Sequence, residues 1–242
     1  MSSLLRLFYG VLLWGAALWL AWLLLALANF FYPQAYAWLD IGHTLQTYVP
    51  QNRFGKQDYP VADMAQHVQH FYAMVQAIHA QGAGLAEISY HNAQGEPLGR
   101  LLTADEVLHL QDVARLVSAG MFAGGVMLLG WLSTCLMLAK RGQRLPTLTG
   151  IGVWSLISLF VLGGIVAALG FKPVFYQMHI WIFPADHPWF FYYQDSLMSS
   201  LMQAPNLFAV IGVLWLLLAL ALLSLLHILA TLLLRRAFKP VY

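Results

Sequence analysis

Three side chains that could support acid–base chemistry recur at a spacing of three residues, at Glu106, His109 and Asp112. On an α-helix, residues three positions apart are neighbours on one face, so the imidazole would meet both carboxylates. A carboxylate that accepts from one imidazole nitrogen fixes the tautomer and leaves the other nitrogen available as a base. The spacing therefore favours general acid–base chemistry at His109. Two simpler interpretations stay open, with Glu106 as a helix cap and Asp112 as a solvating residue.

A second histidine, His179, lies in the aromatic stretch Phe175–Phe183, where tyrosine is the only other ionisable residue type. Ionisable groups close to hydrocarbon mark functional sites by default. An interfacial hydrogen-bonding role is the alternative for this residue. His109 and His179 are the two candidate catalytic histidines, and Asp112 or Glu106 would orient His109.

The remaining histidines give weaker signals. His67 and His70 are spaced like two metal ligands on a helix, but no acid or cysteine pattern completes a site. His187 stays open because it lies near His179 in the sequence. We interpret the others as exposed or capping residues, namely His43, His79, His91 and His227.

Several familiar sites are excluded by what the sequence lacks. It contains no G-x-G-x-x-G or G-x-x-x-x-G-K motif, so a nucleotide site has no support, and no G-x-S-x-G serine elbow. The single cysteine, Cys135, excludes an intrachain disulfide and a multi-cysteine zinc site. We expect no metal, no cofactor and no nucleic-acid partner.

The composition is that of a membrane protein. The 242 residues are 60% hydrophobic and 9% charged, against roughly 45–50% and 25% in soluble domains. An α-helix needs about 20 apolar residues to cross the hydrocarbon core. We therefore expect an all-α membrane protein in which residues 1–242 form a single membrane domain. Its four transmembrane helices are expected at residues 7–30, 114–139, 147–171 and 206–234.

The first apolar run is expected to be a signal anchor. It is longer than the roughly 7–15 residues of a cleavable signal peptide's apolar region, and it is rich in Trp and Tyr. Basic residues without any acid gather at one side of the four expected spans, and these are Arg6, Lys140, Arg141, Arg144, Arg235, Arg236 and Lys239. Because cytoplasmic loops carry the excess of Lys and Arg, both termini are predicted to be cytoplasmic. The candidate histidines then fall on the extracytoplasmic face.

Residues 35–113 form an expected outer cap, which is too long for a simple connection. Apolar residues at helical spacing predict an amphipathic helix over Val61–Ala80. Alternation from Leu85, a turn at Asn92–Gly95 and the segment Leu98–Leu102 predict a short β-hairpin.

A helix must carry His109 from the outer cap into the second span. Thr103 and Glu106 form a capping box, and no proline interrupts the sequence from Ala104 to Ala139, so one long helix is expected there. Residues 172–205 form an expected outer interfacial segment, because they are rich in Phe, Tyr and Trp. This segment carries His179.

Two stretches of the chain resemble the bacterial lipoprotein intramolecular transacylase family. The first is Glu106-x-x-His109-Leu110-x-Asp112-Val113. The second is Phe175-x-x-x-His179-x-x-x-Phe183, followed by Trp189, Asp195-x-Leu197-Met198, Pro205 and Phe208. The order of these stretches and the four expected spans also fit the family.

The resemblance implies an enzyme of the bacterial cytoplasmic membrane. It would move the sn-2 acyl chain of a diacylglyceryl-modified lipoprotein to the α-amine of the same modified cysteine, giving a lyso-form lipoprotein. His109 and His179 would be the acid–base pair, without a nucleophilic residue. Expected partners are the lipoprotein substrate and membrane lipid. Candidate substrate-binding residues are Trp181, Phe183, Trp189, Tyr192 and Asp195.

Two points stay open at this stage. The sequence does not identify which histidine is the base, and the oxyanion donors could be backbone amides, Tyr192, Tyr193, Trp181 or Lys172. The alternative functions are a non-catalytic membrane assembly factor and a haem- or quinone-binding membrane protein that uses His227.

Overall fold

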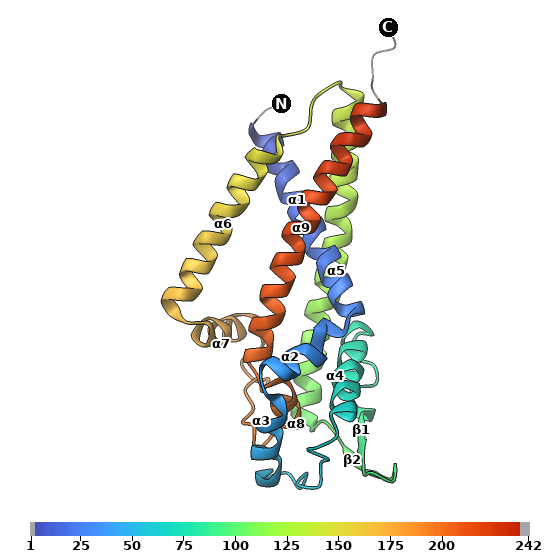
Figure 1. Ribbon diagram of the computed structural model, residues 1–242, viewed down its shortest axis with the longest axis vertical. Coiled ribbons are helices and arrows are strands. Elements are labelled where there is room, and N and C mark those ends of the chain that lie inside the picture. Colours follow the sequence, from blue (N-terminus) through green and yellow to red (C-terminus); the bar gives the residue numbers. More distant parts are fainter. Residues whose placement is uncertain (1–2, 238–242) are drawn as a thin grey trace. The chain divides into compact units, whose positions relative to one another are not determined.

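The computed structural model describes residues 3–237 (Figure 1). In this part of the chain four helices are long and apolar enough to cross a membrane, which confirms the predicted fold class. The candidate spans are Leu4–Leu27, Ala104–Lys140, Thr149–Leu169 and Asn206–Leu234. Lys239 and the side chains of Arg235 and Arg236, all counted among the cytoplasmic bases, lie outside what is described.

The chain forms two compact units by its internal contacts. The span unit comprises Met1–Leu24, Gly120–Gly170 and Val213–Tyr242. The site unit comprises Leu25–Ala119 and Phe171–Gly212. All the candidate catalytic and substrate-binding residues belong to the site unit.

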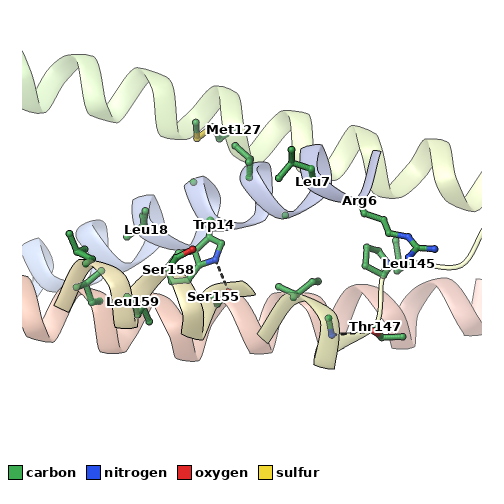
Figure 2. A pocket seen from close by; sticks show the side chains of 18 of the residues that line it. Arg6, Leu7, Trp14, Leu18, Met127, Leu145, Thr147, Ser155, Ser158 and Leu159 are labelled. Carbon is green, nitrogen blue, oxygen red and sulfur yellow. Dashed lines mark hydrogen bonds between the residues drawn. The ribbon is translucent and has the colours of Figure 1, made fainter. Parts of the chain in front are cut away.

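The span unit is built from parts of four long helices that are apolar around much of their circumference, as lipid-facing helices are. They are α1 (Ser3–Leu27), α5 (Ala104–Lys140), α6 (Leu148–Leu169) and α9 (Asn206–Ala237). The side chain of Thr147 caps α6 by accepting a hydrogen bond from the Gly150 amide, and Gly170, with φ of 83°, ends it. A hydrogen bond of 2.8 Å from Trp14 Nε1 to Ser155 Oγ joins α1 to α6 (Figure 2).

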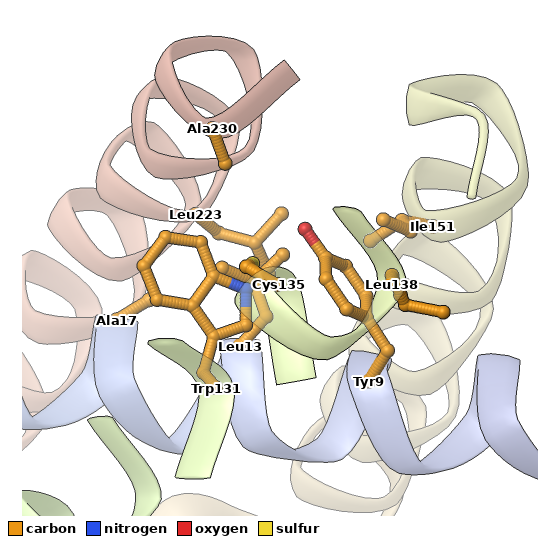
Figure 3. Packing of buried hydrophobic residues seen from close by; sticks show 9 residues of the cluster. All are labelled: Tyr9, Leu13, Ala17, Trp131, Cys135, Leu138, Ile151, Leu223 and Ala230. Atoms are coloured by element: carbon orange, nitrogen blue, oxygen red, sulfur yellow. The ribbon is translucent and has the colours of Figure 1, made fainter. Parts of the chain in front are cut away.

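The core of the span unit takes side chains from all four helices (Figure 3). Tyr9, Trp131 and Leu223 are among its buried members. The Tyr9 hydroxyl lies 2.9 Å from Nδ1 of His227, which is 3% exposed. The interpretation of His227 as an exposed or capping residue was wrong, because its imidazole has a buried hydrogen-bond partner on another helix.

The site unit holds shorter elements as well as the first turns of α5 and α9. Its complete helices and strands are α2 (Tyr32–Trp38), α3 (Ile41–Tyr48), α4 (Met64–His79), β1 (Ser89–His91), β2 (Pro97–Arg100), α7 (Phe171–Ile182) and α8 (Leu197–Met202). Three 3₁₀-helices cover Asn29–Phe31, Val49–Gln51 and Leu85–Glu87. The helix α3 packs against α8, and α2 contacts both α3 and α4.

The predicted amphipathic helix is α4, which Asp63 caps by accepting from the Gln66 amide at 3.0 Å. Its apolar face is anchored by Phe71, whose ring stacks on Tyr32 at 4.1 Å. The Tyr32 hydroxyl donates to the Leu201 carbonyl at 2.7 Å. Ring stacking and a buried hydrogen bond thus tie α4 and α8 to α2.

The predicted hairpin forms, but it is shorter than the alternating pattern suggested. The strands β1 and β2 pair antiparallel with Ser89 opposite Arg100. Gly82 and Gly84 have positive φ, and the turn that they make leads Leu85–Glu87 into a 3₁₀-helix instead of a strand. The expectation that alternation from Leu85 marked a strand was therefore wrong for its first residues.

The first long helix ends at Leu27, and α2 and α3 follow it before α4. The connections between these helices contain Asn29, Phe30, Phe31 and Asp40, which have positive φ although they carry side chains. Positive φ is uncommon for non-glycine residues. The sequence pattern did not indicate α2 or α3.

Candidate active site

The start of α5 is fixed by the predicted capping box. Oε2 of Glu106 accepts from the Thr103 amide at 2.6 Å, and Oγ1 of Thr103 accepts from the Glu106 amide at 3.3 Å. The other carboxylate oxygen, Oε1, accepts from the Ser196 hydroxyl. Ser196 in turn caps α8 by accepting from the Ser199 amide at 2.8 Å. Glu106 is fully buried, so it holds the beginnings of α5 and α8 together.

Lys56 is close enough to Glu106 for their charges to interact. Burial lowers the pKa of the Lys56 ammonium, and the negative charge of Glu106 partly offsets that effect. Its Nζ donates to the Leu101 carbonyl at 2.7 Å, just before the capping box. Lys56 therefore stabilises the segment that leads into α5.

His109 lies one turn further along α5 and faces His179 of α7. The centroids of the two imidazoles are 6.0 Å apart. Each histidine is 8% exposed, and the Phe183 ring lies 4.9 Å from the His109 ring and 5.2 Å from the His179 ring. The two imidazoles thus come together from separate segments, with an aromatic side chain against both.

The tautomer of His179 follows from its hydrogen bond. Nδ1 lies 2.7 Å from the carbonyl of Phe175, one turn earlier in α7. A carbonyl only accepts, so Nδ1 carries the proton and the lone pair of a neutral ring is on Nε2. Burial lowers the pKa of His179, partly offset by the Phe175 carbonyl, so the ring is neutral at pH 7. Nε2 has no hydrogen-bond partner in the described part of the chain.

The expected hydrogen bonds to His109 are not formed. Among residues 3–237, neither ring nitrogen of His109 has a hydrogen-bond partner. Asp112 instead accepts from Nη1 of Arg115 at 2.7 Å and from Nδ1 of His187 at 2.5 Å. The negative charge of Asp112 remains close to His109 and interacts with it electrostatically.

The aromatic residues divide into two groups around this pair. Trp189 lies 5.1 Å from His179 and Phe191 lies 6.1 Å from His109. Trp181 is 78% exposed and Tyr192 is 59% exposed, so both lie at the surface of the protein. Of the proposed oxyanion donors, Tyr193 already donates its hydroxyl proton to the Ala204 carbonyl at 2.8 Å.

Asp195 anchors the loop that carries these aromatic residues. Arg53 binds both of its carboxylate oxygens at 2.5 Å, and the Arg53 amide donates to the Gln194 carbonyl at 2.8 Å. The guanidinium also lies over the Tyr192 ring at 5.9 Å. Asp195 therefore holds the loop in place through Arg53.

Four of these contributors were missed or left open at the sequence level. The sequence pattern does not indicate Arg53, Ser196 or Arg115 as site residues, and it leaves the role of His187 open. Arg115 could have been found from its i,i+3 spacing to Asp112. The others pair with residues 75 or more positions away, which no local pattern reveals.

His67 and His70, which are spaced like metal ligands, instead form hydrogen bonds inside the site unit. Nδ1 of His67 lies 3.0 Å from the Tyr36 hydroxyl, and Nε2 lies 2.8 Å from the Pro60 carbonyl. His70 is held likewise, by the Tyr59 hydroxyl at 2.9 Å and the Ser89 carbonyl at 3.2 Å. Within the described residues no group of three or more His, Cys, Asp or Glu side chains is arranged to hold a metal ion.

Four helices long and apolar enough to cross a membrane define the chain as a multi-pass membrane protein, and its site unit holds a buried pair of imidazoles. Residues 7–204 match the family model of the lipoprotein intramolecular transacylase Lit. The chain belongs to this family, and it is an acyltransferase that acts on lipoproteins.

A solved structure has the same fold. It is the in meso structure of the membrane-integral lipoprotein intramolecular transacylase Lit from Bacillus cereus, in a histidine-to-arginine variant. The TM-score is 0.66 at 14% sequence identity, over 97% of this chain and 92% of the other. A comparison with curated proteins finds no match. Neither the assembly factor nor the haem- or quinone-binding alternative is favoured by these comparisons.

Proposed function

We propose that His109 and His179 are the acid–base pair of the acyl transfer. The observation that carries this proposal is the pairing of two buried imidazoles whose centroids are 6.0 Å apart and three of whose four nitrogens lack a partner within residues 3–237. A nitrogen that already has a hydrogen-bond partner is less available to a substrate. The unpartnered nitrogens on the two rings remain available to exchange protons with a substrate.

His179 is the base in this proposal. The acceptor amine has a pKa of roughly 8, so it is mostly protonated at neutral pH and must lose protons to attack and form an amide. The lone pair on Nε2 of His179 is suited to accept one, because Nδ1 is held as a donor by the Phe175 carbonyl. The amine nitrogen then bonds to the ester carbonyl carbon.

His109 completes the transfer. As the tetrahedral intermediate collapses, the bond from the carbonyl carbon to the sn-2 glycerol oxygen breaks, and that oxygen needs a proton. The ammonium loses two protons in all: His179 accepts the first and releases it to solvent, and His109 accepts the second from the tetrahedral intermediate and delivers it to this oxygen. Asp112 and His187 are positioning residues here, because Asp112 bonds to His187 and acts on His109 only through its charge.

No nucleophilic side chain is needed because donor and acceptor belong to one molecule. The product is a lyso-form lipoprotein that is N-acylated on its first cysteine. Well-oriented intramolecular reactions reach effective molarities of about 10⁵–10⁸ M, so folding the lipid into a reactive geometry supplies much of the rate. Phe183 and Trp189, whose rings pack beside the imidazoles, would hold the reacting lipid there.

Mass spectrometry of a reporter lipoprotein tests this proposal in a bacterial host that makes only the diacylglyceryl form. Co-expression of the wild-type chain is expected to convert the reporter to the lyso-form. The His179→Ala variant is expected to leave it unconverted, while His43→Ala, at an exposed histidine of α3, converts it fully. Full conversion by His179→Ala, at matched membrane abundance, would contradict the assignment.

We further propose that the site faces away from the cytoplasm. The support is the charge distribution, since Arg6 and the connection with Lys140, Arg141 and Arg144 carry bases without acids. A C-terminal fusion to a fluorescent protein that folds only in the cytoplasm is expected to fluoresce. Alkaline phosphatase fused at the same place is expected to be inactive. An active phosphatase fusion would contradict the proposed orientation.

A further inference from the structure

The span unit contains a cavity of about 1370 Å³ that shares no residue with the histidine site (Figure 2). Its walls come mainly from α1, α6 and the connection that precedes α6. The body of the cavity is apolar, with Leu7, Val11 and Leu18 on α1 and Leu159 and Leu162 on α6. Leu7 and Val11 are half exposed or more, so protein atoms leave these side chains uncovered.

The charged lining residues lie at one end of the cavity. Arg6 at the start of α1 and Arg144 in the connection both line it, and both are exposed. Among residues 3–237 neither guanidinium has an ion-pair or hydrogen-bond partner, and the lining residues include no Asp or Glu. The chemistry of this end suits an anion.

The length of the cavity matches one leaflet of a bilayer. Arg6 and Leu18 are twelve residues apart on α1, which corresponds to about 18 Å along the helix. Half of the hydrocarbon core is about 15 Å thick. The cavity thus runs from the level of the basic residues to about the middle of the membrane, whereas a helix of another protein would cross the full thickness.

The wall between the helices is shaped to receive a flexible apolar chain. Trp14 presents its ring there with its Nε1 proton already donated to Ser155 Oγ. Gly10 also lines the cavity, and a Cβ added to it would meet no atom within 4 Å. The backbone of α1 at Gly10 therefore borders open space.

We propose that this cavity binds one phospholipid with a net anionic headgroup, from the leaflet on the side of the connection between α5 and α6. Arg6 and Arg144 pair with the headgroup phosphate, and an acyl chain lies between α1 and α6. A zwitterionic lipid would place its ammonium beside two guanidinium groups with no carboxylate in the lining. A bound lipid stabilises the span unit because it binds the folded state.

Native mass spectrometry of the full chain in detergent micelles tests the proposal, with palmitoyl-oleoyl phosphatidylglycerol as the anionic probe and the corresponding phosphatidylcholine as the zwitterionic one. The wild-type chain is expected to retain one phosphatidylglycerol, and to bind it at least about tenfold more tightly than phosphatidylcholine. An excess of inorganic phosphate is expected to leave the complex intact. Equal retention of the two lipids, or displacement by phosphate, would overturn the proposal.

Matched variants test separately how the basic end and the apolar body of the cavity contribute to lipid binding. The double variant Arg6→Gln with Arg144→Gln is expected to lose the preference for phosphatidylglycerol, whereas Arg141→Gln, in the same connection but outside the lining, keeps it. Gly10→Leu is expected to reduce retention of both lipids by filling the cavity. Gly163→Leu on α6 is its control, because a side chain there also meets no atom within 4 Å but lies outside the lining.

The thermal unfolding midpoint of each variant in lipid-free detergent shows whether it folds. If both variants fold, the proposal is overturned when the double arginine variant keeps the preference for phosphatidylglycerol and Gly10→Leu retains both lipids as the wild-type chain does. If a variant does not fold, measurements on the wild-type chain still decide between the two lipids.

Discussion

Two pairs of histidines in the site unit are buried to nearly the same extent but differ in what their ring nitrogens contact. His67 and His70 on α4 are 0% and 5% exposed, and each of their four nitrogens has a tyrosine hydroxyl or a carbonyl beside it. His109 and His179 are both 8% exposed, and in the described chain only Nδ1 of His179 has a partner. Burial does not distinguish the pairs, whereas the unpartnered ring nitrogens do.

Under the proposed function, the two pairs of histidines have separate roles. A histidine with both nitrogens satisfied contributes hydrogen bonds to a buried structure, and each such bond contributes about 1 kcal/mol to stability. A buried histidine with free nitrogens contributes little to stability and is open to a substrate. The comparison therefore predicts losses of turnover at one pair and losses of stability at the other.

The pH dependence of turnover should give the largest effect. Protonation of the substrate amine lowers the rate about tenfold per pH unit below roughly pH 8. The pKa of His179 lies below its usual value because the ring is buried. Below that pKa the base is also lost, so the slope should steepen to about a hundredfold per unit.

Single-turnover rates of a purified chain with a subsaturating diacylglyceryl lipopeptide, measured from pH 4 to 9, check this profile. A profile whose slope stays at tenfold per unit throughout would rule out His179 as the base.

The second effect is a loss of stability at the hydrogen-bonded pair. His70→Ala leaves the Tyr59 hydroxyl and the Ser89 carbonyl without their partner, which should cost about 2–4 kcal/mol of unfolding free energy. Denaturant unfolding in mild detergent measures it, with His43→Ala as the exposed control. Turnover per folded molecule should remain near the wild-type value, and its loss would place His70 in the chemistry.

The stability contributed by His70 should also depend on pH. Burial lowers the pKa of His70 to about 4, whereas the unfolded chain has a histidine pKa of about 6.5. Between these values the unfolded state binds a proton that the folded state does not, so stability is complete above pH 6.5 and falls as pH falls. The wild-type unfolding midpoint should drop between pH 7 and 5, and His70→Ala should reduce that drop.

A smaller effect is expected at Asp112, which lies close to the proposed acid–base pair without a hydrogen bond to it. Asp112→Asn removes the charge that His187 and Arg115 share, and turnover should fall by at most about tenfold, less than the loss of a general base. The change should appear in kcat and in the pH profile and leave KM unaffected. A variant that changed only stability would make Asp112 a purely structural residue.

The smallest effect is expected at the ion pair of Arg53 and Asp195. The Arg53 side chain is 61% exposed, and exposed ion pairs are screened by water. Arg53→Ala should therefore change the unfolding free energy by less than about 1 kcal/mol. A much larger loss in the unfolding measurement would show that the guanidinium, through Asp195 and the Tyr192 ring, is a major support of this loop.

The features that could be predicted from the sequence are those set by neighbouring residues. The capping box of Thr103 and Glu106 and the uninterrupted helix after it are local, and so is the turn of the hairpin, where Asn92 accepts from the Gln94 and Glu96 amides. Four helices of membrane-crossing length follow from composition alone.

What the sequence could not predict depends on contacts between distant residues. Asp112 looked suited to orient His109 from its own helix, yet His187, which is 75 positions away, takes its second oxygen. Glu106 likewise accepts a hydrogen bond from the distant Ser196 rather than from His109. Phe30 and Phe31, two of the left-handed residues before α2, belong to a type that rarely adopts positive φ, so their positions gave no turn signal.

The most direct test measures turnover of a diacylglyceryl lipopeptide by purified chains in lipid nanodiscs, normalised to the folded fraction, for alanine variants of His67, His70, His109 and His179. His109→Ala and His179→Ala are expected to lose at least about a hundredfold, as for removal of a general acid or base, while His67→Ala and His70→Ala keep wild-type turnover per folded molecule. Wild-type turnover by either His109→Ala or His179→Ala would contradict the proposed acid–base pair.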